Sequence, residues 1–291
     1  MKRVTFSVVT PSYNQGEFLE DTIRSVLCQK GDFHIDYIIM DGGSTDSSLD
    51  VIKKYDRILK EGQWKIKCSG INYRWVSEKD KGQADAIEKG FSLSFGDIGV
   101  WLNSDDTFYS DTVFETVAGY FRTEDVDLII GNGITIDRKG CKIWDYKTER
   151  INFKELVFLD YHILQPSAFL KMHYFKNNHF DKSLIYTFDV EFFISLLCSG
   201  IRYKKVPKNF SSFRIYPEIK TMSGLEKRHR EFYRIAKGVT KNPFLLSLSW
   251  IYKYLEVVIR IKYSNSKLMR RTFPVIRNIF YFIILGTWGR K

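Results

Sequence analysis

The sequence predicts an α/β fold in which a mostly parallel β-sheet is covered by helices on both faces. Two observations predict it. Short apolar segments alternate with segments whose apolar residues recur at helical spacing, which is the pattern of strand–helix–strand units. Clusters of polar residues directly follow the apolar segments, and in open α/β sheets ligands bind at that end of the strands.

Five strands are expected from the apolar segments, at residues 6–10, 37–40, 73–76, 100–102 and 128–130. Pro11 ends the first strand, and the polar run DGGS at 41–44 ends the second. Helices fill the intervals. Apolar residues at 19, 23, 26 and 27 repeat at helical spacing, Asp46 caps a helix through about Tyr55, and residues 84, 87 and 91 share one helical face.

The pattern from about residue 132 to residue 212 is more irregular. Val190, Phe193, Ile194 and Leu197 form a helical stripe, which places Asp189 at or near the N-terminus of a helix. The four cysteines are far apart and show no paired spacing, so neither a zinc site nor a disulfide framework is expected. We expect buried thiols in a reducing compartment.

The C-terminal part of the chain differs from the rest in charge. Residues 1–200 hold 24 Lys and Arg against 30 Asp and Glu, whereas residues 201–291 hold 21 against 4. Ser223 and Glu226 have the spacing of a capping box for a helix to about Lys237, with Gly238 as its stop. Asn242-Pro243 opens a second helix. Its polar stripe consists of Ser249, Lys253, Glu256 and Arg260.

Nearly everything else in that second helix is apolar, so it needs cover on most sides. A further apolar run at 279–285 follows Arg270, Arg271 and Arg277. Two interpretations stay open: this tail lies on an anionic membrane surface, or it packs against the rest of the chain or a second subunit. No apolar run reaches the roughly 18 residues of a transmembrane helix. No RRM, KH or helix-turn-helix signature accompanies the charge, so nucleic acid is not expected as a partner.

Asp105 and Asp106 follow the fourth predicted strand and are the first candidates for chemistry. Two adjacent carboxylates repel each other unless a cation offsets their charge. Their hard oxygen atoms suit Mg²⁺ or Mn²⁺, which in turn bind a diphosphate. Alone, such a pair is more often a turn or a helix cap.

Four motifs occur in order at the expected strand ends. They are VVTPSYN at 8–14, MDGGSTD at 40–46, WVSEKDKGQADA at 75–86 and WLNSDD at 101–106. With them the chain resembles, over residues 5–200, the family 2 glycosyltransferases, particularly those that assemble bacterial O-antigen, capsule or exopolysaccharide. The resemblance implies a GT-A fold, with a mostly parallel Rossmann-like sheet flanked by helices and followed here by a basic helical tail.

The resemblance implies donor-binding roles for Thr10, Pro11, Tyr13, Asp41, Asp80, Lys81, Gln83, Asp85, Asn103 and Asp105. Tyr13 lies in the loop where the nucleotide base stacks, Asp41 hydrogen-bonds the base, and Asp105 lies near ribose and sugar. Asp106 matches the ligand of the metal, Mn²⁺ or Mg²⁺. Taken alone, Tyr13 reads better as a packing residue and Asp41 as a turn cap.

Asp189 matches the catalytic base of the family, and a helix N-terminus would keep its carboxylate ionised. A plain helix cap is its alternative role, and Glu191 is the other candidate base.

His162 and Gln165 resemble the acceptor-side segment; His162 either approaches the metal or is a hydrogen-bonded structural histidine. Two departures stand out: Gly42 replaces an aspartate that is usual in the base-binding motif, and Lys81 is a weak candidate for the phosphate-side cation.

Together these features predict an inverting, metal-dependent glycosyltransferase. It would use a nucleotide-sugar donor, with UDP expected, and a saccharide acceptor that is lipid-linked. We expect a catalytic domain over 1–220 and a tail over 221–291, and a cytoplasmic enzyme peripheral to the inner face of the membrane. The alternative is a non-catalytic protein that binds nucleotide-sugar, nucleic acid or membrane. A dehydrogenase is excluded because GxGxxG is missing after the first strand. The oligomeric state stays open.

Overall fold

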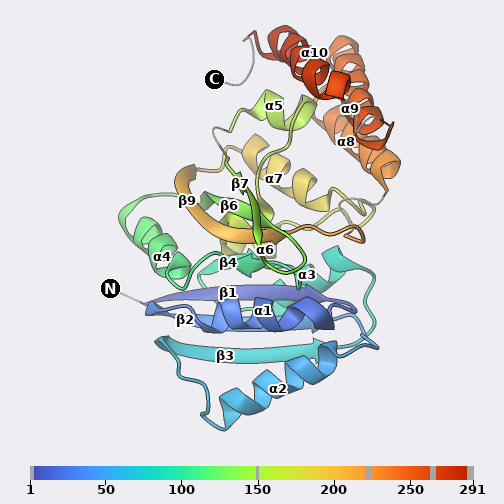
Figure 1. The fold of residues 1–291 in the computed structure, drawn as a ribbon. Helices are drawn as coiled ribbons and strands as arrows, with labels where there is room; N and C mark the ends of the chain where they lie inside the picture. The colour runs from blue at the N-terminus through green and yellow to red at the C-terminus, as the bar shows by residue number, and fades with distance from the viewer. Residues whose placement is uncertain (1–2, 149–150, 220–223, 263–266, 287–291) are drawn as a thin grey trace. The chain divides into compact units, whose positions relative to one another are not determined.

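The computed structural model describes residues 3–148, 151–219, 224–262 and 267–286 (Figure 1). The chain forms two compact units, each described by itself. Unit 1 comprises Met1–Glu149, Ile163–Lys182 and Gly200–Tyr216, and unit 2 comprises Arg150–His162, Ser183–Ser199 and Pro217–Lys291. The two units interleave along the sequence, and the predicted functional division at residue 220 stays a prediction.

Unit 1 is built on one sheet with the strand order β3-β2-β1-β4-β8-β6-β9-β5, and β7 pairs with β6. Its strands are β1 (Val4–Ser12), β2 (Gly31–Asp41), β3 (Cys68–Ser77), β4 (Ile98–Trp101), β5 (Thr107–Phe108), β6 (Leu128–Ile136), β7 (Lys142–Tyr146), β8 (Ala168–Lys171) and β9 (Tyr203–Arg214). Strands β3, β2, β1 and β4 are all parallel. Beyond them the sheet is mixed, because β8 runs antiparallel to both β4 and β6.

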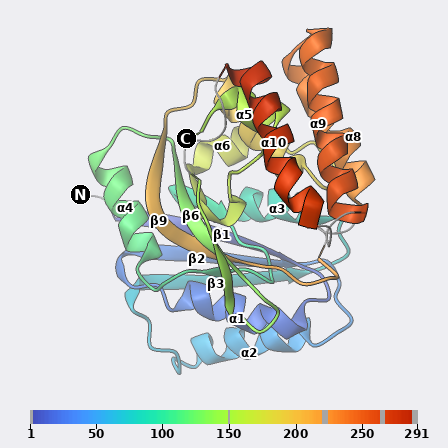
Figure 2. The ribbon, with the colours of Figure 1, turned by 45° about the horizontal axis from the view of Figure 1, so that its top comes forward.

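The helices of unit 1 are α1 (Gly16–Leu27), α2 (Ser48–Lys60), α3 (Gln83–Leu93), α4 (Val113–Thr123) and α6 (Met172–Asn177), and Gln165–Ser167 forms a short 3₁₀ turn. Figure 2 shows α1 and α2 on one side of β1–β3 and α3 on the other. Alternation along β1 explains this cover: Val8 packs with the helices α1 and α2, whereas Val9 lies under Gly90 of α3. The predicted α/β fold class is therefore confirmed.

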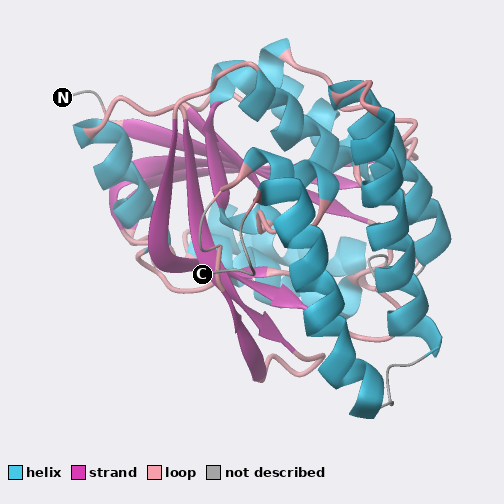
Figure 3. Cartoon of the chain, turned by 90° about the horizontal axis from the view of Figure 1, so that it is seen from above, coloured by secondary structure: helices cyan, strands magenta, loops and turns pink. Residues whose placement is uncertain are grey.

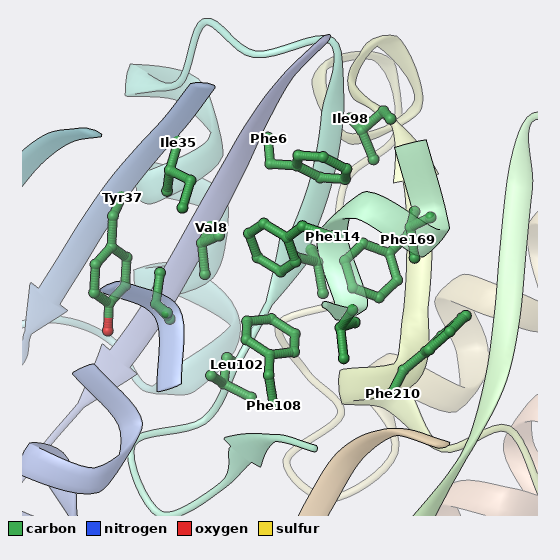
Figure 4. Packing of buried hydrophobic residues seen from close by; sticks show 14 of the residues in the cluster. Phe6, Val8, Ile35, Tyr37, Ile98, Leu102, Phe108, Phe114, Phe169 and Phe210 are labelled. Carbon is green, nitrogen blue, oxygen red and sulfur yellow. The ribbon is translucent and has the colours of Figure 1, made fainter. Parts of the chain in front are cut away.

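Aromatic side chains dominate the core between the sheet and α4 (Figure 4). The ring centroids of Phe6 and Phe114 are 4.6 Å apart, and those of Phe108 and Phe114 are 4.8 Å apart. Phe169 of β8 meets Phe210 of β9 edge-on at 5.8 Å. Such packing of rings that are fully or nearly fully buried fixes the sheet whose strand ends carry the candidate site.

Unit 2 is helical in its described residues, with α5 (Phe153–Phe158), α7 (Phe188–Cys198), α8 (Leu225–Val239), α9 (Pro243–Lys262) and α10 (Lys267–Leu285). The last three lie side by side (Figure 3). The hydroxyl of Tyr252 on α9 donates to Asp160 Oδ1 at 2.9 Å, and that of Tyr281 on α10 lies 2.6 Å from Glu155 Oε1. These bonds join α9 and α10 to the segment around α5.

The buried face of α9 includes part of its predicted polar stripe. Ser249 and Lys253, half of the predicted polar stripe, are buried, while the apolar side chains of Phe244, Trp250 and Ile251 are exposed. Lys253 is tolerated inside because its ammonium group lies 4.1 Å from the ring centroid of Phe232 on α8. These apolar side chains are uncovered in the single chain, and what covers them stays a prediction.

Smaller predictions also meet the structure. Asn242 caps α9 as expected, since its side-chain oxygen accepts the backbone N–H of Phe244 at 3.0 Å. Gly238 does not stop α8, which runs on to Val239. Ser223 and the side chains of residues 260–272 lie outside the described residues, so the capping box and Arg260, Arg270 and Arg271 are not described.

Two further predictions concern the cysteines and the membrane. The cysteines are free, but the expected burial is wrong: two are exposed, Cys141 and Cys198, and two are partly exposed, Cys28 and Cys68. Within the described residues, no helix combines the length and apolar character that crossing a bilayer requires.

Candidate active site

The candidate site of unit 1 lies where its parallel strands end. Because β1, β2, β3 and β4 run in one direction, the loops at 12–16, 41–47, 77–83 and 102–106 emerge at one edge of the sheet. Main-chain bonds join adjacent loops: Gly42 N–H donates to Ser12 O at 2.8 Å, and Glu78 N–H donates to Asp41 O at 2.9 Å. The four predicted donor motifs therefore meet as expected.

The two acidic side chains at 105 and 106 are held in different ways. Asp106 is fully buried, and its Oδ1 accepts the backbone N–H of Arg214 at 2.9 Å while its Oδ2 accepts Asn103 Nδ2 at 3.2 Å. Asp105 is partly exposed, and its Oδ2 accepts the hydroxyl of Tyr216 at 2.9 Å. The buried carboxylate thus fixes the turn, and its neighbour is the one that meets solvent.

Burial is the main cause that raises the pKa of both carboxyl groups. The pKa of Asp106 lies well above its ordinary value, because the negative charge of Asp105 adds to the effect of burial. Burial also raises the pKa of Asp105, and the hydrogen bond from Tyr216 opposes this rise. A cation placed beside two carboxyl groups with raised pKa values stabilises their ionised forms.

Three residues of this site were missed in the sequence: Gln15, Arg214 and Tyr216. The buried guanidinium of Arg214 donates to the carbonyl oxygens of Asp105 at 2.9 Å and Arg138 at 2.9 Å. The hydroxyl of Tyr216 joins Asp105 to Gln15, whose Nε2 lies 3.3 Å away. Arg214 and Tyr216 lie more than 100 residues from the acidic turn, so no local pattern in the sequence points to them.

Gln83 connects the loop after β3 to the acidic turn. Its Nε2 donates to Asn103 Oδ1 at 2.7 Å, and Asn103 in turn donates to Asp106. Gly82 precedes it with φ at +106°, a backbone conformation that favours glycine. The predicted donor-binding residues Gln83 and Asn103 therefore form one hydrogen-bonded chain with Asp106, the predicted metal ligand.

Asp85 is engaged by cations of the protein itself. Its Oδ1 lies 2.9 Å from Lys182 Nζ and its Oδ2 lies 3.4 Å from Lys89 Nζ. The hydrogen bond from Lys182 is the main cause that lowers the pKa of Asp85 to about 2. Lys81, the suggested phosphate-side cation, is exposed, and its backbone N–H donates to Asp85 Oδ2 at 3.2 Å.

The base-side loop has one exposed ring and several buried groups. Tyr13 is 62% exposed, next to Asn14, which adopts a left-handed φ of 52° that asparagine tolerates. Thr10 and Pro11 are buried, and the hydroxyl of Thr10 lies 3.1 Å from that of Tyr37. Asp41 is also buried. Of the predicted base-side residues, Tyr13 is therefore the one that offers a surface for stacking.

The predicted base belongs to unit 2. Asp189 lies in the first turn of α7, at the helix N-terminus that the sequence predicts, and is partly exposed. Glu191 accepts a bond from Ser195 Oγ at 2.7 Å. His162 is buried, and its Nδ1 lies 2.9 Å from Asp160 O and 3.7 Å from Glu155 Oε1. These bonds favour the structural role for His162.

The residues of the acidic turn fit a divalent cation of the kind that phosphates help to bind. No group of three or more His, Cys, Asp or Glu side chains in the described residues is arranged to hold a metal by itself. Mg²⁺ usually takes one or two carboxylates and completes its shell with water and substrate phosphates. Asp105, the partly exposed carboxylate of the turn, fits such a ligand set, with Asp106 directly behind it.

Comparison with known families decides the assignment. The sequence profile described as glycosyl transferase family 2 matches residues 7–186, more than half of the chain. The chain belongs to this family. The four motifs at 8–14, 40–46, 75–86 and 101–106 all fall within the matched range, and the predicted family membership is confirmed.

Relatives of this family 2 glycosyltransferase include several bacterial and archaeal proteins. An uncharacterised glycosyltransferase of Methanocaldococcus jannaschii is 23% identical over 83% of this chain and 81% of its own length. The poly(ribitol-phosphate) beta-N-acetylglucosaminyltransferase TarP of Staphylococcus aureus is 31% identical over 64% of this chain and 52% of its own. The putative teichuronic acid biosynthesis glycosyltransferase TuaG of Bacillus subtilis is 34% identical over 36% of this chain, which spans 37% of TuaG.

Solved structures confirm the fold that the family resemblance implied. Residues 1–349 of S. aureus TarS in complex with UDP-GlcNAc match with a TM-score of 0.62 at 15% identity, over 96% of this chain and 81% of that chain. The mannosyltransferase PcManGT of Pyrobaculum calidifontis, in complex with GDP-Man and Mn²⁺, matches with a TM-score of 0.59 at 14% identity, over 90% and 71%. At these identities the likeness establishes the GT-A type of fold and nothing finer.

Proposed function

We propose that this glycosyltransferase moves a sugar, with inversion, from a nucleoside-diphosphate donor to a hydroxyl of a saccharide acceptor. The observation that carries the proposal is the acidic turn at 105–106. Gln83 after β3, and Arg214 and Tyr216 at the end of β9, hold this turn at the carboxyl end of β4. Two adjacent carboxyl groups with raised pKa values, one of them fully buried, are costly to maintain without a cationic ligand. A cation bound by the donor's diphosphate offsets that cost.

Mn²⁺ or Mg²⁺ is the proposed cofactor, and it would neutralise the charge that develops on the departing diphosphate. PcManGT was crystallised with Mn²⁺ on a related fold, which supports this choice. In this chain Asp105 offers the solvent-facing carboxylate, and Asp106, the predicted ligand, holds the turn behind it. Gln83 and Asn103 then lie beside the bound donor and orient it.

Asp189 is the proposed base, which removes the proton of the acceptor hydroxyl as that oxygen attacks the anomeric carbon. Its position in the first turn of α7 stabilises the ionised carboxylate that this role needs. Asp189→Asn should abolish transfer and leave donor affinity unchanged, with Glu191→Gln as the matched control. Near-normal turnover by Asp189→Asn would disprove the role.

The donor and acceptor classes are proposed from relatives. TarS was solved with UDP-GlcNAc, so a UDP-sugar is the first donor to test. TarP and TuaG are named for work on poly(ribitol-phosphate) and teichuronic acid, which supports a cell-surface polysaccharide as the acceptor class. We further propose that the acceptor is lipid-linked and that the enzyme acts at the cytoplasmic face of the membrane.

The membrane part of this proposal is supported by unit 2. Helices α9 and α10 expose a set of large apolar side chains: Phe244, Trp250, Ile251, Tyr254, Val275, Ile279, Phe282 and Ile283. The adjacent α8 exposes the cations Lys227, Arg230 and Arg234. Apolar stripes beside basic residues suit a surface of anionic lipid.

A donor screen tests the central proposal. Purified enzyme is incubated with UDP-, GDP- and dTDP-sugars and Mn²⁺, and released nucleoside diphosphate is measured with and without EDTA. We expect release with one nucleotide class and its loss in EDTA. Binding without turnover for every donor, with or without a saccharide acceptor, would favour the non-catalytic alternative.

A further inference from the structure

The carboxylate predicted to hydrogen-bond the nucleotide base, Asp41, is buried and already accepts several hydrogen bonds from the protein. Its Oδ2 accepts Ser77 Oγ at 2.6 Å and the backbone N–H of Ser44 at 3.1 Å, and its Oδ1 accepts Ser44 Oγ at 2.5 Å. The residue is 2% exposed. Asp41 thus offers little of its surface to a base, and a more exposed carboxylate nearby is the better-placed acceptor.

Asp80 occupies the place that the missing side chain of Gly42 leaves open. A Cβ atom on Gly42 would lie 2.8 Å from Asp80 Oδ2 and 3.3 Å from Tyr13 Cδ2. The carboxylate of Asp80 and the exposed ring of Tyr13 thus approach the same point above the Gly42 backbone. An aspartate at position 42 would exclude Asp80 from this point.

The two oxygens of Asp80 have separate surroundings. Oδ1 accepts the backbone N–H of Gly82 at 2.7 Å, which fixes the orientation of the carboxylate. Oδ2 faces Gly42 and the ring of Tyr13. It therefore offers an oriented, negatively charged acceptor beside a surface for base stacking.

We propose that Asp80 determines nucleotide specificity by accepting the ring N–H of a base stacked on Tyr13. This inference rests on the proposed function, because it assigns the base end of the same donor site. It selects bases with a ring N–H on that edge, such as uracil, thymine or guanine. Cytosine and adenine present a lone pair there, and Asp80 repels it.

Asp80→Asn is a sharp test because Gly82 controls how the new amide lies. The amide oxygen keeps the bond from Gly82 N–H, so the NH₂ group takes the place of Oδ2. Affinity for UDP should fall about 10- to 100-fold, as expected on losing a charge-assisted hydrogen bond. CDP, whose N3 accepts a hydrogen bond, should gain relative to UDP.

The experiment measures UDP, CDP and N3-methyl-UDP by titration calorimetry with Mn²⁺, on the full chain and on Asp80→Asn. N3-methylation of UDP should lower its affinity for the wild-type enzyme by the same factor as the Asp80→Asn mutation lowers the affinity for UDP. For Asp80→Asn, N3-methyl-UDP should bind almost as well as UDP. Glu78→Gln is the matched control, because Glu78 is an exposed carboxylate two residues away that pairs with Lys89 at 3.1 Å. It should leave all three affinities unchanged.

The outcomes separate the two proposals. If the wild-type enzyme binds none of the nucleotides, including GDP and dTDP, the proposed function itself fails. If it binds UDP but Asp80→Asn keeps the wild-type ratio of UDP to CDP affinity, the role of Asp80 is overturned while the function stands. Equal affinity of the wild-type enzyme for UDP and N3-methyl-UDP would likewise overturn the role of Asp80 and leave the proposed function standing.

Discussion

Replacing Arg214 by methionine should destabilise the acidic turn and weaken donor binding together. The guanidinium is 2% exposed and donates to three backbone carbonyls, those of Asp105, Asp137 and Arg138. Its fourth bond goes to Asp21, whose side chain is 63% exposed. Methionine fills a similar apolar volume but donates nothing. The carbonyls of Asp105 and Arg138 therefore lose the donor described here, whereas that of Asp137 keeps the backbone N–H of Gly140 at 3.0 Å.

The magnitude follows from these bonds. A carbonyl left without a donor costs about 1–3 kcal/mol when it is shielded from water and less at Arg138, which is exposed; the pair with Asp21 adds less than about 1 kcal/mol. Because solvent partly replaces the lost donor, we expect about 3 kcal/mol in total. For a protein of 291 residues that lowers the melting temperature by roughly 5 °C.

Thermal melts and calorimetry with UDP and Mn²⁺ measure both effects. Arg3→Met is the control, because Arg3 and Asp32 form an ion pair with both side chains at least 60% exposed, and such pairs contribute little. Arg214→Lys should recover part of the stability. A melting temperature of Arg214→Met within about 2 °C of wild type would refute the reasoning, as would unchanged UDP affinity in a destabilised but folded variant.

Three other perturbations follow. Asp105→Asn should weaken Mn²⁺-supported UDP binding with little change in melting temperature. Asp106→Asn should instead lower the free energy of unfolding by about 1–3 kcal/mol, because it turns an acceptor of two hydrogen bonds into a partial donor. If calorimetry and thermal melts show the reverse pattern, Asp106 is the metal ligand. Lys182 lowers the pKa of Asp85 from 3.8 to about 2, so this pair adds stability above pH 3.8 that is lost as the pH falls toward about 2. The deficit of Lys182→Met in urea unfolding should therefore shrink across that window, and a constant deficit would contradict it. Phe282→Ser, at a side chain 54% exposed, should reduce flotation with anionic liposomes without lowering the melting temperature, and unchanged flotation would count against the membrane surface.

Sequence periodicity was sufficient for the strands that carry the donor loops. The apolar runs at 6–10 and 37–40 are buried on both faces, so their pattern is strong and places the polar residues after them at one sheet edge. The strands β8 and β9 were not predicted, because their side chains mix apolar and polar types and they pair across the chain. The roles of Arg214 and Tyr216 could not be predicted either, because they depend on the pairing of strands that are far apart in the sequence.

The tail shows a second limit of periodicity. A helix with one narrow polar stripe is expected to turn that stripe outward, yet Lys253 of α9 lies inside. The sequence contains the ring that accepts this cation, Phe232, but not the packing of α8 against α9 that brings them together. Which face of an amphipathic helix meets solvent is a tertiary property.

The exposure of the carboxylates of the site is also a tertiary property, and it distinguishes those that shape the turns from those that face a ligand. Asp106 and Asp41 are buried and accept bonds only from the protein among the described residues, so they shape the turns after β4 and β2. Asp105 and Asp80 retain some exposure, so they are the carboxylates that a ligand meets. Neighbouring aspartates look equivalent in a sequence, but in the fold their side chains point in different directions. One carboxylate is buried and bonded to the protein, and the other is left exposed to a ligand. A motif of paired acids therefore predicts the place of the chemistry and leaves the acting residue to be found from the hydrogen bonds.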